Sequence, residues 1–220
     1  LVTIAESTIM PGLLWVGADD GNVQVSRDGG ATWTEVGQNV PGGTMTYYVS
    51  RVEASHFDPA TAYISLDGHR SDDLRPYVFV TRDYGRSWQS ISANLPAHGN
   101  VHTVRQDLRN RNLLYAGTEF GMFVSFDDGD HWQSFQLDLP ATPVTDIRVH
   151  RKDLILSTMG RSFWIMDDIT PLHQLHDQVA DNEPHLFKPR DTFRMRWSQT
   201  TSVDDGAAPE YPPFGALIYY

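Results

Sequence analysis

The sequence predicts an all-β repeat protein built from units of four short strands. A box with the pattern Ser/Thr-x-Asp-x-Gly-x-x-Trp occurs three times, at 26–33, 81–88 and 125–132. Short runs rich in β-branched and aromatic residues flank each box and end at turn residues, which is typical of strands. No helical periodicity of useful length occurs before Pro171.

The strands are expected in four successive sets. The first set is expected at 2–6, 13–17, 23–26 and 33–36, and the second at 50–55, 62–66, 77–81 and 88–91. The third is expected at 101–106, 113–117, 122–125 and 132–135. The fourth comprises 144–149, 153–157 and 162–166, after which the box has decayed to Met166-Asp167-Asp168. The resulting units span about 1–37, 49–92, 100–136 and 144–168.

The repeated box consists of residue types that suit a tight turn. Its Asp can accept hydrogen bonds from backbone N–H groups of its own turn, and its Gly supplies a positive φ. The Ser or Thr adds a local hydroxyl bond, and the Trp is expected to bury its ring against the sheet. We therefore assign a structural role to Ser26, Asp28, Gly30, Trp33, Thr81, Asp83, Gly85, Trp88, Ser125, Asp127, Gly129 and Trp132.

Composition and charge exclude several classes of protein. A hydrophobic content of 40% and a charged content of 20% are typical of a globular chain. No apolar run is long enough for a membrane-spanning helix, and the absence of cysteine excludes disulfides and Cys-ligated zinc. The net charge of −11 argues against a nucleic-acid partner.

Signals for a metal or a cofactor are weak. His173-Gln174-Leu175-His176-Asp177 places two His residues near a carboxylate, but no third ligand follows at a fixed spacing. The glycines lie in hairpin turns rather than between a strand and a helix, so no phosphate-binding loop is expected. We predict neither a metal nor a cofactor.

The box resembles the Asp-box, or bacterial neuraminidase repeat, of sialidases, xyloglucanase-type glycoside hydrolases, sortilin receptors and photosystem assembly factors. The stretches 50–54, 67–73, 186–191 and 212–216 are more narrowly similar to sortilin-like propellers, often labelled glycosyl hydrolases, of large bacterial exported proteins. The resemblance implies a β-propeller of four-stranded antiparallel blades, with the box between the third and fourth strands of a blade. It also implies an extracytoplasmic protein, periplasmic or secreted.

About four blades are fewer than such propellers usually contain. We therefore expect the remaining blades on a second chain or in a missing part of the same protein, and we expect this chain to be a fragment. After the fourth blade we expect a connector at 169–184. The stretch 185–220 is expected to hold a strand returning to the propeller, around 187–197, and the start of a truncated β domain.

One long polar loop, 67–76, is a candidate functional site, because loops on a rigid scaffold often carry function. The connector 42–48 is expected on the same face. Candidate ligand-binding residues are Tyr47, Tyr48, His69, Arg70 and Arg161. A glycosidase would need a pair of carboxylates, for which the candidates are Asp67, Asp72, Asp73 and Glu119. The alternative is a surface loop whose Asp and Arg residues pair with each other.

Arg51 and Glu53 lie two positions apart on an inner strand and therefore share one face of it. We expect them to form buried ion pairs between blades rather than contacts to a substrate.

The favoured function is a non-catalytic binding or scaffold module of a large exported bacterial protein, with a carbohydrate or a peptide as its ligand. One alternative is part of a xyloglucanase-like glycoside hydrolase that uses paired carboxylates. A second is a sortilin-like receptor whose peptide adds to a strand edge. Sialidase activity is not expected, because the Phe/Tyr-Arg-Ile-Pro segment typical of sialidases is missing and the nearest Arg-rich stretch, 193–197, lies outside the repeats.

Overall fold

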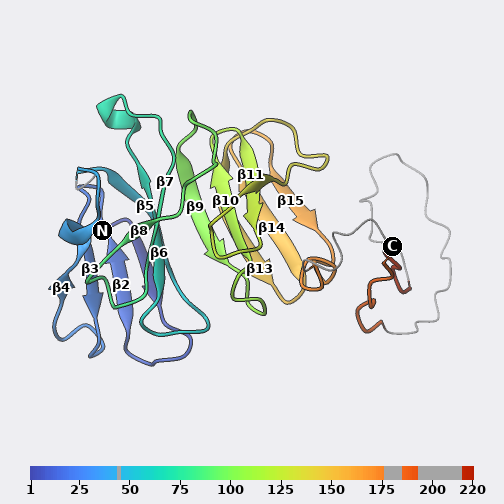
Figure 1. Cartoon of the computed structure of the whole chain (residues 1–220), viewed down its shortest axis with the longest axis horizontal. Helices are drawn as coiled ribbons and strands as arrows, with labels where there is room; N and C mark the ends of the chain where they lie inside the picture. Colours follow the sequence, from blue (N-terminus) through green and yellow to red (C-terminus); the bar gives the residue numbers. More distant parts are fainter. Residues whose placement is uncertain (44–45, 176–184, 193–214) are drawn as a thin grey trace, which may run out of the picture.

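A computed structural model describes residues 1–43, 46–175, 185–192 and 215–220. The described residues form four antiparallel sheets that lie side by side in an arc (Figure 1). In each sheet the strand order follows the sequence, as in the blade of a propeller. The predicted all-β fold of propeller blades is therefore confirmed.

The blades have these strands. The first contains β1 (Thr3–Glu6), β2 (Leu14–Gly17), β3 (Val23–Ser26) and β4 (Thr34–Glu35). The second contains β5 (Tyr48–Ala54), β6 (Ala62–Asp67), β7 (Tyr77–Thr81) and β8 (Gln89–Ser90). The third contains β9 (Val101–Gln106), β10 (Leu114–Thr118), β11 (Gly121–Ser125) and β12 (Gln133–Ser134). The fourth contains β13 (Val144–His150), β14 (Asp153–Thr158) and β15 (Phe163–Met166).

The fourth blade has the three expected strands among the described residues. One detail differs from the strands expected in the four blades. The outer strands β4, β8 and β12 contain only two residues each, because the chain leaves the sheet soon after the box Trp. Residues 185–192 and 215–220 form no strand, so the strand expected at 187–197 is not formed over its described residues 187–192. Residues 193–197, most of the connector at 169–184 and most of the following β domain lie outside the described residues.

The core is divided among the three contacts between neighbouring blades. Strand β6 shows how the side chains alternate, as expected for a strand covered on both faces. Its residues Ala62, Ile64 and Leu66 belong to the apolar cluster shared with the first blade. Tyr63, between them, belongs to the cluster shared with the third blade. A third cluster joins the third and fourth blades.

The first and fourth blades each have one face that no other blade formed by the described residues covers (Figure 1). Ile4 on β1 is 60% exposed, and Phe163 and Ile165 on β15 are 73% and 61% exposed. These apolar side chains would be buried if further blades continued the arc. No helix in the described part of the chain is long and apolar enough to cross a membrane.

Candidate functional site

Each repeated box closes the turn between the third and fourth strands of its blade. In the first box, Asp28 accepts hydrogen bonds from the backbone N–H of Thr32 at 2.8 Å and from the hydroxyl of Ser26 at 2.8 Å. The Ser26 hydroxyl in turn accepts one from the N–H of Gly30 at 2.8 Å. The hydrogen bonds from Thr32 are the main reason that the pKa of Asp28 falls to about 2. Asp28 is therefore engaged within its own turn.

The second and third boxes also attach their blades to the preceding blade. The indole N–H of Trp88 donates to the carbonyl oxygen of Val36 at 3.1 Å, and that of Trp132 donates to Ile91 at 2.6 Å. A Cβ at Gly85 would lie only 2.6 Å from the Cβ of Val36, so this position needs glycine for close packing. The box of one blade and the end of the outer strand of the preceding blade thus form an interface that occurs twice in the described residues.

The first box lacks this interface. Its Trp33 is 39% exposed, whereas Trp88 and Trp132 are 7% and 4% exposed. The Trp33 N–H donates to Gly30 of its own turn, at 3.0 Å. The expectation that Trp33 is buried is therefore wrong, because no blade precedes the first among the described residues.

Two of the four candidate carboxylates have structural hydrogen bonds. Asp67 is buried and accepts hydrogen bonds from the backbone N–H of His69 at 2.9 Å and the amide of Asn100 at 2.6 Å. Asp73 accepts hydrogen bonds from the hydroxyls of Tyr47 and Tyr77, at 2.9 and 2.7 Å.

Asp73 also forms an ion pair with Arg75, with 2.7 Å between Oδ2 and Nη2. The hydrogen bonds from Arg75 are the largest reason that the pKa of Asp73 lies well below its ordinary value. This pairing of Asp and Arg is the alternative that the sequence left open for the loop. A carboxylate held in this way is a poor general acid.

The remaining candidates are spread over the second, third and fourth blades. Asp72 is exposed at the end of the short helix η2 (His69–Ser71), with φ at 58°. Glu119 lies 2.9 Å from His102, and the Arg70 guanidinium lies 5.2 Å from the ring centre of Tyr48. Arg161 is exposed in the turn between β14 and β15. The structure thus brings Tyr47 to Asp73 and Arg70 to Tyr48, and the roles of these residues in binding or catalysis remain predictions.

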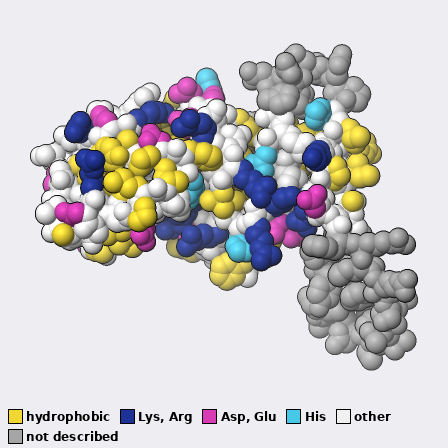
Figure 2. Space-filling model, turned by 90° about the horizontal axis from the view of Figure 1, so that it is seen from below, with side chains coloured by type: hydrophobic (Ala, Val, Ile, Leu, Met, Phe, Trp, Pro, Cys, Tyr) yellow, Lys and Arg dark blue, Asp and Glu magenta, His cyan; other side chains and the backbone are white. Residues whose placement is uncertain are grey.

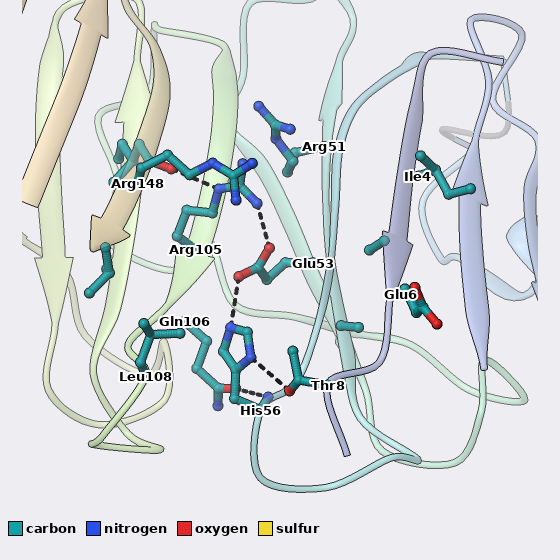
Figure 3. Close-up of a pocket in the computed structure, with 14 residues that line it drawn as sticks. Ile4, Glu6, Thr8, Arg51, Glu53, His56, Arg105, Gln106, Leu108 and Arg148 are labelled. Atoms are coloured by element: carbon teal, nitrogen blue, oxygen red, sulfur yellow. Dashed lines mark hydrogen bonds and ion pairs between the residues drawn. The ribbon is translucent and has the colours of Figure 1, made fainter. Parts of the chain in front are cut away.

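A cavity of about 260 Å³ lies between the inner strands of all four blades (Figure 3). Strand β1 contributes Ile4 and Glu6, whereas β5, β9 and β13 contribute four charged side chains. These are Arg51, Glu53, Arg105 and Arg148. None of the residues that the sequence singled out for binding or catalysis lines this cavity.

A network of ion pairs joins three blades beside the cavity. Arg105 of the third blade lies 2.6 Å from Glu53 of the second and 2.9 Å from Asp146 of the fourth. Arg51 of the second blade lies 2.6 Å from the same oxygen of Asp146. The prediction that Arg51 and Glu53 form ion pairs between blades is therefore confirmed, and the pair of Glu53 with Arg105, which is the buried one, is drawn in Figure 3.

The network favours the charged forms of Asp146 and Arg105. Burial alone would raise the pKa of Asp146, but Arg105 and Arg51 outweigh it and hold that pKa below its ordinary value. Burial would lower the pKa of Arg105, but the charges of Glu53 and Asp146 outweigh burial and raise that pKa above its ordinary value. Arg148 has no ion-pair partner among the described residues, so it remains available to a ligand in the cavity.

The sequence contains a signal for this cavity that single motifs did not reveal. Three successive inner strands carry polar or charged residues two positions apart, at Arg51 and Glu53, Thr103 and Arg105, and Asp146 and Arg148. Aligning the strands of the repeats would have placed these residues on the channel side of each blade. The described residues contain no group of three His, Asp or Glu side chains that could hold a metal ion, and His176 and Asp177 lie outside them.

Comparison with protein-family models gives no match, and comparison with curated protein sequences gives none either. Solved structures do match. YCF48 bound to the D1 peptide is 18% identical with a TM-score of 0.54, over 75% of this chain and 50% of that one. The GH74 xyloglucanase from Xanthomonas campestris is 15% identical with a TM-score of 0.57, over 76% and 29%. The GH74 enzyme from Niastella koreensis is 14% identical with a TM-score of 0.60, over 76% and 28%.

These similarities define the class of protein as a β-propeller and show the fold alone. The chain spans about half the length of the YCF48 chain and less than a third of each GH74 chain that it matches.

Proposed function

We propose that this chain is a non-catalytic segment of a larger β-propeller and serves as a binding and scaffold module. The observation that carries this proposal is the contrast among the three boxes. Trp88 and Trp132 are buried against a preceding blade, whereas the equivalent Trp33 is exposed beside Gly30. An exposed box of the same pattern offers a preformed docking surface to one more blade.

The occupied boxes define the chemistry of that blade. The outer strands β4 and β8 are followed by Val36-x-x-Asn39 and Ile91-x-x-Asn94, and these residues contact the boxes. In each pattern the backbone carbonyl of the apolar residue accepts the hydrogen bond from the indole N–H of the box Trp. The Asn binds the box as well: the Asn39 side chain donates to the carbonyl of Gly85 at 2.8 Å. We expect the blade that covers Trp33 to end in the same pattern, on a second chain or in another part of the same protein.

The same proposal covers the wider identity of the protein. We infer that the boxes are Asp-boxes of the sortilin-like type and that the whole protein is a large exported bacterial one, which the repeated pattern and the long loop 67–76 support. A peptide is the first ligand to test in the central cavity, because YCF48, which shares the fold, is described bound to the D1 peptide. A carbohydrate is the second.

The mass of the particle in solution tests the assembly. We expect the isolated protein to contain additional blades and to exceed the 24.8 kDa of this chain. If the additional blades lie on a second chain, Trp33→Lys should release this chain from the particle, because burying an unpaired charge in the interface is costly. Leu74→Lys, at an exposed apolar residue of the loop, is the matched control. A 24.8 kDa particle for the wild type, with Trp33 accessible to quenchers, would overturn the proposal.

An assay of polysaccharide hydrolysis tests the non-catalytic assignment. Because Asp67 and Asp73 are held by structural partners, we expect no turnover of xyloglucan or other β-glucans by the assembled protein. The GH74 structures make hydrolysis the rival function. Hydrolysis that disappears in Asp72→Ala or Glu119→Ala, with unchanged unfolding, would contradict our assignment and establish a glycoside hydrolase.

A further inference from the structure

A second cavity, of about 300 Å³, has basic walls. It lies beside the turn that joins β9 to β10 in the third blade and the turn that joins β13 to β14 in the fourth. Four Lys and Arg side chains line it, together with His173. Figure 2 shows Lys and Arg side chains gathered on the lower face of the molecule. The four Lys and Arg residues that line the cavity are Arg109, Lys152, Lys188 and Arg190.

Three different parts of the chain bring these cations together. Arg109 lies in the turn between β9 and β10, and Lys152 lies in the turn between β13 and β14. Lys188 and Arg190 lie in the segment 185–192, far along the sequence. The convergence of distant segments on one cavity distinguishes this cluster from a run of charges along one solvated strand.

Specific contacts fix the walls of the cavity. The Gln174 side chain donates to the carbonyl of Lys188 at 3.0 Å and accepts from its N–H at 2.9 Å. Arg190 forms an ion pair with Asp153, at 3.1 Å, which ties the segment to the fourth blade. His173 lies 2.9 Å from the buried carboxylate of Asp107. The site is therefore positioned before any ligand arrives, which favours binding.

The positive charge in the cavity is not neutralised. Arg190 is paired with Asp153, but Arg109, Lys152 and Lys188 have no ion-pair partner in the part of the chain that the structure describes. Asp191 is the only carboxylate among the lining residues. In a chain with a net charge of −11, three unpaired cations around one cavity are a local reversal of sign.

We propose that this cavity binds an oxyanion, a phosphate or sulfate group carried by a small molecule or a saccharide. Tetrahedral oxyanions accept several charge-assisted hydrogen bonds at once, and Arg and Lys provide such donors. A volume of about 300 Å³ suits one such group with the unit that carries it. This inference does not depend on the number of blades in the complete propeller.

Calorimetric titration of the whole protein with inorganic phosphate and with sulfate, at constant ionic strength, tests the inference. Arg109→Gln and Lys152→Gln should each weaken binding about 10-fold, the effect expected for one charge-assisted hydrogen bond. Arg86→Gln is the matched control, because Arg86 is exposed in the turn between β7 and β8 of the second blade and does not line this cavity.

Saturable binding that both cavity variants weaken and Arg86→Gln does not would support the site. Tighter binding of phosphate would point to a phosphorylated ligand, and tighter binding of sulfate to a sulfated one. Absence of binding by either anion beyond that of chloride would overturn the inference. An equal response in all three variants would do the same, because it would indicate general screening.

Discussion

Trp88→Ala or Trp132→Ala is expected to lower the free energy of unfolding by about 3–5 kcal/mol. Each ring is almost fully buried between two blades, and each indole N–H donates to a carbonyl of the preceding blade. Truncation would leave a cavity in the interface and a buried carbonyl without its donor. Both losses fall on contacts that hold neighbouring blades together.

Trp33→Ala is the matched control, because it removes the same residue from the same box. Its ring is 39% exposed and contacts no preceding blade, so we expect a loss below roughly 1 kcal/mol in the isolated chain. Urea unfolding followed by circular dichroism measures all three variants. A near-neutral Trp88→Ala would contradict the assignment of the blade interfaces, and a large effect of Trp33→Ala would show that its face is already covered.

The contrast among the boxes also shows what a sequence can predict in a repeat protein. Strand positions follow from local alternation and turn residues, and β3, β7 and β11 lie where these signals place them. The burial of Trp33 does not follow, because it depends on a neighbouring blade rather than on the box itself. Three boxes with the same pattern therefore have different surroundings.

The candidate site was predictable only in part, for a similar reason. The sequence identified the polar loop and its residue types, but it could not show that the Tyr47 hydroxyl and Arg75 both bind Asp73. Those contacts depend on how the connector folds back over the loop. The central cavity was missed because its walls come from four strands, none of which carries a recognisable motif.

Arg105→Ala is expected to destabilise the protein by about 3–5 kcal/mol, which is the usual cost of breaking a buried ion pair from one side. The substitution would leave Glu53 buried without its guanidinium partner and would remove one of the two cations beside Asp146. Arg105→Met, combined with Glu53→Gln, should recover much of this loss, because no uncompensated charge then remains. If the double variant is no more stable than Arg105→Ala, the loss arises from packing and not from charge.

The pH dependence of stability separates the charge of Asp146 from its packing. Its pKa is held below the ordinary Asp value in the folded protein, so the unfolded chain binds the proton more readily. The stabilisation from Asp146 is therefore fully present above pH about 4 and is lost as the pH falls through the folded pKa. Asp146→Asn should reduce stability at pH 7 and make it less sensitive to acid, measured by urea unfolding between pH 3 and 7. An unchanged acid profile in Asp146→Asn would mean that the network joins the blades by hydrogen bonds whose strength does not depend on this charge.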